Sequence, residues 1–89
     1  MFHFVYILKS DVDKSLYVGY TKNIKRRIEE HNQGLNFSTK SKKPWVLIFF
    51  EGYRSEIDAK RREKYLKTIQ GSRTVKRMLK EYLFLNNEQ

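Results

Sequence analysis

The sequence contains no cysteine, one proline and four glycines among its 89 residues. Without cysteine the chain has neither a disulfide framework nor a thiolate metal site, which fits a reducing compartment. No hydrophobic run approaches the roughly 20 residues of a membrane span. The apolar start lacks the basic segment of a signal peptide, and Lys9 and Asp11 interrupt it. We therefore expect a cytoplasmic protein that does not enter the membrane.

Acidic residues are scarce relative to basic ones. The chain has 19 Lys and Arg against 10 Asp and Glu, a formal net charge of +9 and a sequence pI near 9.9. A small domain with this excess attracts polyanions, of which nucleic acid is the commonest. The alternative is that the charge only keeps the surface soluble. A chain this short supports one core, so we expect a single domain over residues 1–85 and a frayed tail over 86–89.

Three runs of the sequence have the composition of strands. Residues 2–8 are almost wholly apolar, β-branched or aromatic, which predicts a central strand covered on both faces. A polar loop leads to residues 16–20, which resume the pattern and are expected to pair with the first run in antiparallel fashion. Pro44 precedes a third run over residues 45–51. These runs predict a small antiparallel sheet.

Three further segments have helical signals. Thr21 is expected to cap the first helix and Gly34 to end it. Residues 55–58 have the form of a capping box, and Gly71-Ser72 is expected to break the chain after the second helix. The helices are expected over residues 22–33, 55–69 and 73–85. The predicted fold is therefore mixed α/β (α+β), with a three-stranded antiparallel sheet flanked by about three helices in the order β-β-α-β-α-α.

The first predicted helix carries charged and polar residues on its apolar stripe. Ile24 and Ile28 mark the stripe, and Arg27 and His31 lie on the same side. An unpaired buried guanidinium is costly. Arg27 therefore either extends along the edge of the stripe to a carboxylate or faces a groove and binds an anion.

The second predicted helix poses a similar question at Glu63. At about 100° per residue, Ala59, Leu66 and Ile69 fall on one side and a row of lysines on another. Glu63 lies between the two sides. It is either an ordinary i,i+4 partner of Lys67 or a ligand for Mg²⁺ beside a phosphate.

The third predicted helix has two distinct faces. Its expected inner face is formed by Val75, Met78, Leu79 and Tyr82. Its opposite face is formed by Arg73, Lys76, Arg77 and Lys80. The basic face is either solvated surface or a surface that follows a nucleic-acid backbone without reading its sequence.

Two tyrosines stand out by their position. Tyr6 and Tyr17 lie on neighbouring predicted strands, just before the helix that carries Arg27. Aromatic residues in a small domain are first of all core residues. A phenol, with a reference pKa near 10, acts as a base near neutral pH only if a metal or cations favour the phenolate. A site with Arg27 and a divalent ion would meet that demand.

In this order, the segments resemble the GIY-YIG nuclease superfamily. Its first motif corresponds to Phe4-Val5-Tyr6 and its second to Tyr17-Val18-Gly19. The segment from Thr21 to Asn32 resembles the family's arginine helix with its following His-Asn. Pro44-Trp45 and the segment 59–67 resemble later parts of small stand-alone bacterial members, similar to the N-terminal domain of an excision-repair nuclease. The resemblance covers nearly the whole chain.

The resemblance implies metal-dependent endonuclease action on DNA, including branched or damaged DNA in repair. Glu63 would hold a single Mg²⁺ or Mn²⁺ ion, and Arg27 would bind the scissile phosphate and stabilise its developing charge. Tyr17 would position or deprotonate the attacking water, with Tyr6 in support. His31 matches a histidine that assists in some branches. The candidate catalytic residues are therefore Tyr6, Tyr17, Arg27, His31 and Glu63.

Eight basic residues are candidates for contact with the nucleic acid, and the sequence also departs from the family pattern. The basic residues are Lys22, Lys40, Lys42, Lys43, Lys67, Arg73, Lys76 and Arg77. Phe4 stands where the first motif has glycine, Tyr20 stands where larger members have lysine, and residues 74–76 offer no counterpart of a late asparagine. These departures leave a second hypothesis: a nucleic-acid-binding module of the same fold, with DNA or RNA as ligand and little cleavage.

No targeting module is visible in the sequence, so a protein partner or a second copy of the chain would have to supply specificity. A third hypothesis, a structural adaptor, has to explain why Arg27 lies on an inner helix face.

Overall fold

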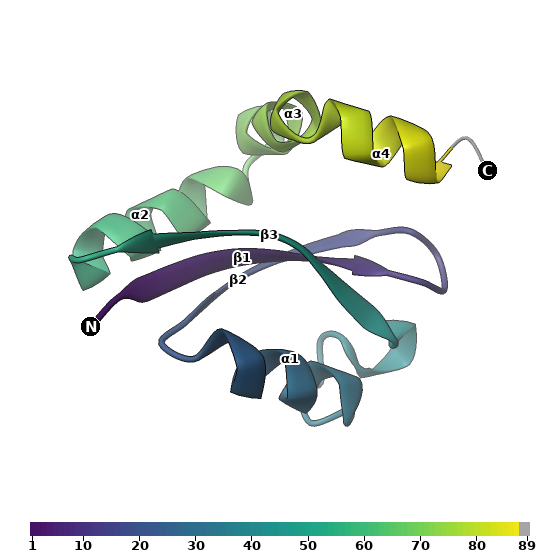
Figure 1. The fold of residues 1–89 in the computed structure, drawn as a ribbon, viewed down its shortest axis with the longest axis horizontal. Helices are drawn as coiled ribbons and strands as arrows, with labels where there is room; N and C mark the ends of the chain where they lie inside the picture. Colours follow the sequence, from purple (N-terminus) through teal and green to yellow (C-terminus); the bar gives the residue numbers. More distant parts are fainter. Residues whose placement is uncertain (88–89) are drawn as a thin grey trace.

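The sheet is antiparallel and has its first strand at the centre. A computed structural model describes residues 1–87. Strands β1 (His3–Ser10), β2 (Leu16–Thr21) and β3 (Trp45–Tyr53) are arranged in the order β2-β1-β3 (Figure 1). β1 is buried from Val5 onward, as expected of a central strand. β3 extends two residues beyond its predicted end because Gly52 and Tyr53 pair with Phe4 and His3 of β1.

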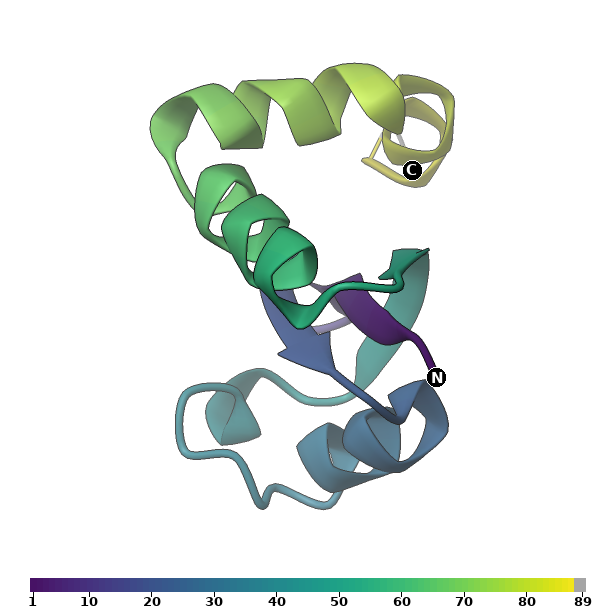
Figure 2. The same ribbon diagram turned by 90° about the vertical axis from the view of Figure 1, so that its left-hand side faces the viewer.

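The helices lie in two layers on either side of the sheet. Helix α1 (Ile24–Asn32) covers one face, together with the connection that contains the short 3₁₀ helix η1 (Lys40–Lys42). Helices α2 (Glu56–Leu66), α3 (Ile69–Met78) and α4 (Lys80–Asn87) lie on the other face (Figure 2). The mixed fold is therefore confirmed, with one helix more than predicted.

Each face of the sheet has its own hydrophobic core. Val5 and Ile7 pack with Leu66 and Val75 in the layer of α2 and α3. Between them in sequence, Tyr6 points to the opposite face, where its cluster includes Trp45 and the inner side of α1. This follows from the alternation of side chains along a strand. Tyr6 is therefore placed on the side of α1, and Val5 and Ile7 on the side of α2.

Helix α1 begins and ends by recognisable backbone motifs. Its N-cap is Asn23, whose side chain accepts a hydrogen bond from the Arg26 N–H, so the predicted cap at Thr21 was wrong. Thr21 is instead the last residue of β2, and its hydroxyl accepts from the Asn23 N–H. Gly34 has φ 79° and donates to the His31 carbonyl, which confirms it as the stop signal.

The break between the second and third helices was predicted in the wrong place. Helix α2 ends at Leu66, and Thr68 caps α3 by accepting from the Gly71 N–H. Gly71 lies inside α3, where a β-carbon would collide with the Tyr65 carbonyl. The glycine therefore does not break the helix. It lets α3 approach the end of α2 closely. Ile69, predicted to face the core, is 77% exposed because it belongs to a different helix.

The last predicted helix is divided at Leu79 into α3 and α4. Val75 is buried and Leu79 packs against its core cluster, but Met78 and Tyr82 of the predicted inner face are partly exposed. The turn between the two helices changes the direction that the later residues face. Helix α4 reaches Asn87 and so includes the start of the predicted frayed tail, and residues 88–89 lie outside the described residues.

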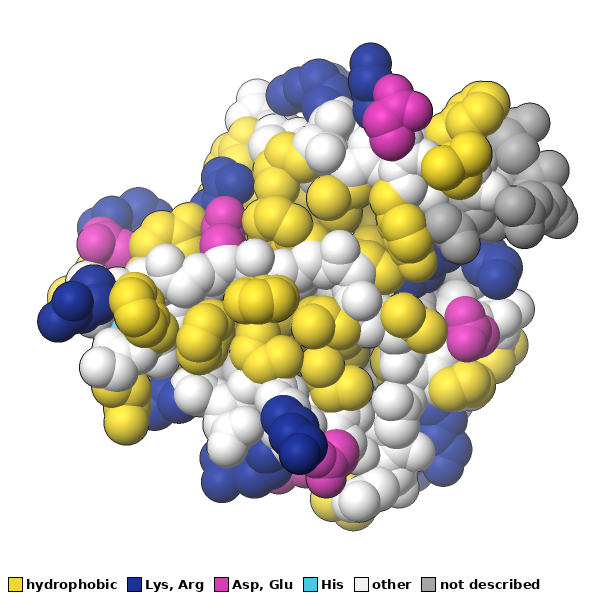
Figure 3. All heavy atoms as spheres, in the orientation of Figure 1, with side chains coloured by type: hydrophobic (Ala, Val, Ile, Leu, Met, Phe, Trp, Pro, Cys, Tyr) yellow, Lys and Arg dark blue, Asp and Glu magenta, His cyan; other side chains and the backbone are white. Residues whose placement is uncertain are grey.

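A band of hydrophobic side chains crosses the face that Figure 3 shows, over β3. Val46 and Phe50 of β3, which is an edge strand of the sheet, are among the exposed large hydrophobic residues. Within residues 1–87, no helix has the length and apolar character needed to cross a membrane.

Candidate active site

Tyr6 lies across the neighbouring strand at a position that has no side chain. In the register of the sheet Tyr6 is opposite Gly19, and a β-carbon on Gly19 would collide with the phenol ring and its hydroxyl. The ring therefore occupies the space above Gly19. The glycine of the second motif thus lets the phenol of the central strand extend over β2, the strand at the edge of the sheet.

Replacing Gly19 with alanine should displace this phenol. We expect the free energy of unfolding to fall by about 1–3 kcal/mol, as for an overpacked core. Gly52→Ala in β3 is the matched control, because its β-carbon would meet Phe4 at 3.2 Å rather than collide. Urea unfolding measures both stabilities, and the NMR shift of His31 Nε2 reports the position of the Tyr6 hydroxyl. Equal, small effects of both substitutions would contradict this account.

A buried hydrogen-bonded chain extends from Tyr6 into α1 and the loop that follows it. The Tyr6 hydroxyl lies 2.8 Å from His31 Nε2, and His31 Nδ1 lies 2.7 Å from Thr39 Oγ1. Thr39 Oγ1 in turn donates to the Asn36 carbonyl. The arrangement that gives every proton an acceptor has Tyr6 donating to Nε2 and Nδ1–H donating to Thr39. His31 is then neutral, with its proton on Nδ1.

The electrostatics of this chain favour the uncharged form of both rings. Burial raises the pKa of Tyr6 well above its ordinary value, with Tyr17 adding to the rise and the Arg27 cation opposing it. Burial, and then Arg27, lower the pKa of His31 below its ordinary value of 6.5. At neutral pH the protein therefore holds a protonated phenol against a neutral imidazole.

Tyr17 connects the two layers at the edge of the sheet. Its ring centroid lies 5.1 Å from that of His31 and 6.4 Å from that of Tyr6. Lys67 Nζ, at the end of α2, lies 5.9 Å from the same ring. Tyr17 is only half-buried, so it is the most exposed of the three packed rings.

Glu63 forms an ion pair of 2.9 Å with Lys67, the residue whose ammonium group lies near the Tyr17 ring. The i,i+4 pair considered for Glu63 is therefore present. Within residues 1–87, no three histidine or acidic side chains gather as a metal site. A single carboxylate, 22% exposed, does fit Mg²⁺, because this ion keeps several waters and takes phosphate oxygens of the substrate as ligands. The residues thus fit an ion shared with a phosphate rather than one held by protein alone.

Arg27 is the residue whose contacts are least complete. Its Nε lies 3.1 Å from Glu30 Oε1, an ion-pair distance, but the two atoms do not form a hydrogen bond. Among the described residues, this Nε is the one buried side-chain nitrogen or oxygen without a hydrogen-bond partner. A buried orphan donor is costly. Arg27 also lies near enough to Tyr6 and His31 to change the pKa of both, so an anion bound by it would lie beside the tyrosines.

The eight predicted nucleic-acid contacts divide between the two layers. The connections flanking α1 carry Lys22, Lys40, Lys42 and Lys43. The end of α2 and helix α3 carry Lys67, Arg73, Lys76 and Arg77. Within residues 1–87, two of the eight form ion pairs, Lys42 with Asp13 at 3.3 Å and Lys67 with Glu63. Every one of the eight is exposed.

Sequence reasoning did not identify two residues that position His31. Asn32 accepts from the Trp45 N–H at 2.6 Å and donates to the Trp45 carbonyl at 3.0 Å. This pairing closes the loop between α1 and β3, and the Trp45 indole donates to the Thr39 carbonyl within it. Thr39 is thereby held against His31. Asn32 could have been identified, because it directly follows His31 in the His-Asn pair that resembles the family. Thr39 could not, because it lies in a polar run without any distinguishing pattern.

Comparison with known proteins defines the class. Residues 2–77 match the family model described as the GIY-YIG catalytic domain. The chain therefore belongs to the GIY-YIG family, a family of nuclease-type domains that generally use divalent metal ions.

Individual relatives are equally small. The chain is 43% identical over 75 residues to a UPF0213 protein of Staphylococcus haemolyticus, covering 83% of this chain and 90% of that protein. It is 40% identical over 80 residues to a UPF0213 protein of Staphylococcus aureus, covering 89% and 95%. The solution NMR structure of a UPF0213 protein from Bacillus halodurans matches with a TM-score of 0.55 and 31% identity, over 88% of this chain and 85% of that one.

Proposed function

We propose that this protein is a divalent-metal-dependent endonuclease that hydrolyses phosphodiester bonds in DNA. The observation that carries the proposal is the buried Tyr6–His31 hydrogen bond beside an arginine whose Nε has no hydrogen-bond partner. A structural core would not require this combination. The combination suits a site where an anion binds Arg27 and Tyr6 passes a proton to His31.

Each residue has a distinct task in this proposal. The half-exposed Tyr17 positions the attacking water. The proton of that water passes to the Tyr6 oxygen as the Tyr6 proton passes to His31 Nε2, which is 2.8 Å away. Arg27 binds the scissile phosphate and stabilises the charge that develops on its oxygens. Glu63 would hold one Mg²⁺ or Mn²⁺ ion, which when bound would polarise the phosphate and neutralise the leaving oxygen.

A cleavage assay tests the proposal directly. The purified protein is incubated with supercoiled plasmid and with labelled branched and damaged DNA, in Mg²⁺, Mn²⁺ or chelator. We expect nicking of DNA in the presence of either metal and none in chelator. Cleavage that persists in chelator would refute metal dependence, and binding without cleavage of any of these substrates would favour a nucleic-acid-binding module.

Thr39 is a positioning residue in this scheme, because it acts on the reaction only through His31. Thr39→Val removes the acceptor of the His31 Nδ1–H, so the imidazole loses the orientation in which Nε2 receives the Tyr6 proton. We expect kcat to fall about 10- to 100-fold, the size of loss found when a hydrogen-bond partner that orients a metal-ligating histidine is removed. KM for DNA should change little, because Thr39 is buried and touches no substrate.

The control and the pH profile separate this role from a merely structural one. Thr39→Ser keeps the hydroxyl and should restore most of kcat. In the native protein, activity should fall as the pH drops through the lowered pKa of His31, because an imidazolium cannot accept the Tyr6 proton. Equal kcat values for Thr39→Val and Thr39→Ser, or an acid limb that lies above pH 6.5, would contradict the role assigned to His31.

A further inference from the structure

Two pockets lie next to each other between the β1–β2 hairpin and helices α3 and α4. The first, of about 320 Å³, is lined by Tyr17, Val75 and Lys67 among others. The second, of about 310 Å³, is lined by the end of the hairpin and by residues of α3 and α4. Leu16 lines both pockets. The two pockets therefore adjoin at Leu16. We call the pair the hairpin groove, and Tyr17 lies in both its first pocket and the ring cluster of the candidate active site.

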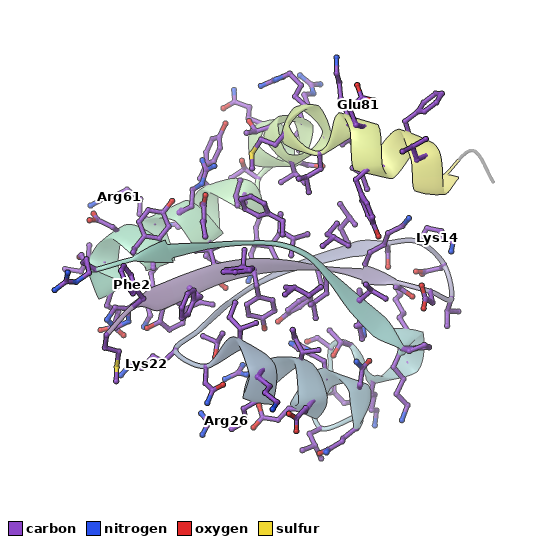
Figure 4. All side chains as sticks on the ribbon, in the orientation of Figure 1. Phe2, Lys14, Lys22, Arg26, Arg61 and Glu81 are labelled. Carbon is purple, nitrogen blue, oxygen red and sulfur yellow. The ribbon has the colours of Figure 1, made fainter. Side chains whose placement is uncertain are left out.

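The charge of the hairpin groove has one sign. Its lining includes four lysines and no acidic residue: Lys14, Lys67, Lys76 and Lys80. Lys14 lies on the hairpin turn (Figure 4). Glu81, the acidic residue next to Lys80 in sequence, extends from the outer side of α4 and lines another pocket there with Lys80 and Phe84. Lys67 is paired with Glu63, so Lys14, Lys76 and Lys80 are the lining cations that best complement a phosphate backbone.

The remainder of the lining is apolar. Leu16 and Val75 line the first pocket together with Tyr17, and Leu83 and Phe84 line the second. Phe84 is 61% exposed, so its ring is available for stacking. Apolar walls with an exposed aromatic ring accept the faces of unpaired bases, whereas the bases of a duplex are stacked on each other. The lysines and the apolar residues of the lining together therefore favour binding of a single strand over binding of a duplex.

The backbone at Lys14 supports this interpretation. Its φ of 66° lies in the left-handed region, which glycine and asparagine adopt at lower cost than lysine. The turn therefore carries a lysine at a position where local conformation favours another residue. The side chain lines the second pocket, where it adds a cation opposite Lys76 and Lys80 on the helices.

We propose that the hairpin groove binds the unpaired DNA strand next to the cleaved bond, with bases in the two pockets and phosphates on the lysines. This inference rests on the proposed function and names its substrate class. Because Tyr17 belongs to both the groove and the ring cluster, a strand that occupies the groove leads directly to the catalytic residues. A DNA with an unpaired segment is therefore the substrate expected to be cut.

Binding measurements in chelator test the groove without any cleavage. Fluorescence anisotropy compares a single-stranded oligonucleotide, its duplex, and the same strand with several bases removed but every phosphate kept. We expect the native protein to bind the intact single strand more tightly than the duplex. Removal of the bases should weaken binding about fivefold or more, as the loss of one base–aromatic stack does. Equal affinity for the intact and base-free strands would overturn the proposal.

Substitutions locate the binding surface. Lys76→Gln with Lys80→Gln should weaken binding of the single strand and reduce the slope of log affinity against log salt by about 0.7 per lost phosphate contact. Lys14→Asn removes a cation without strain in the turn, and Phe84→Ala removes the exposed ring. Lys25→Gln is the control, since Lys25 is exposed on α1 in the other layer. If the groove variants lose no more affinity than Lys25→Gln, the groove does not bind the strand.

The failure of this inference is distinguishable from the failure of the proposed function. Metal-dependent cleavage by a protein whose groove variants bind like the control would leave the nuclease proposal standing and refute the groove. Base-dependent binding in the groove without cleavage in Mg²⁺ or Mn²⁺ would refute the nuclease proposal and support the groove.

Discussion

Replacing Arg27 with methionine is expected to reduce DNA cleavage about 100-fold or more while leaving the stability of the fold unchanged or slightly higher. The loss of cleavage follows from removal of a cation that stabilises charge on the phosphate in the transition state. The effect on stability follows from the buried Nε, which has no hydrogen-bond partner in the free protein. Methionine keeps most of the apolar stem and removes the costly donor.

Arg26 provides a matched control one residue away. Both arginines pair with Glu30, Arg26 at 3.9 Å and Arg27 at 3.1 Å, but Arg26 is 67% exposed and Arg27 36%. Arg26→Met should leave cleavage within a few-fold of the native rate. Rates are measured on a nicked-plasmid assay and stabilities by urea unfolding. A large loss of stability in Arg27→Met with normal cleavage would show that Arg27 is a structural residue.

The sequence was sufficient to predict the sheet and the inward position of Arg27 and His31 on the first helix. The unusual position of Arg27 and His31 could be recognised because a helical stripe depends on spacing within a single helix, and both residues are partly or fully buried as that stripe requires. The pairing of β1 and β2 followed from two apolar runs and a polar loop. Local periodicity determines both features, so no knowledge of distant contacts was needed.

Contacts between distant parts of the chain were not predictable in the same way. Tyr6 and His31 are 25 residues apart, and Lys67 reaches Tyr17 across the edge of the sheet. Both contacts depend on how the layers pack. The helix boundaries near Gly71 failed for a related reason: glycine weakens a helix by propensity, but here the contact with Tyr65 requires it inside α3. The position of the helix boundary was therefore set by tertiary packing and not by the low helix propensity of Gly71.

Replacing Glu63 with glutamine should abolish metal-dependent cleavage and leave DNA binding in chelator intact or tighter. A metal supplies several kcal/mol of charge stabilisation in such reactions. Because each 1.36 kcal/mol changes the rate tenfold, we expect the cleavage rate to fall about 1000-fold. The ion pair with Lys67 is also lost, at a cost in stability of at most about 1 kcal/mol for a pair near the surface. Lys67, which lines the hairpin groove, is then free to contact a phosphate.

Glu56→Gln is the matched control for Glu63→Gln, because Glu56 forms the same i,i+4 pair with Lys60 on the same helix, at 3.3 Å. It frees a lysine in the same way but has no place in the proposed metal site. Cleavage by Glu56→Gln should therefore stay near the native rate at every Mn²⁺ concentration. If both variants lose cleavage equally, the loss reflects the ion pairs of α2 and not a metal ligand. If Glu63→Gln cleaves normally, the metal is held elsewhere and Glu63 serves only as the partner of Lys67.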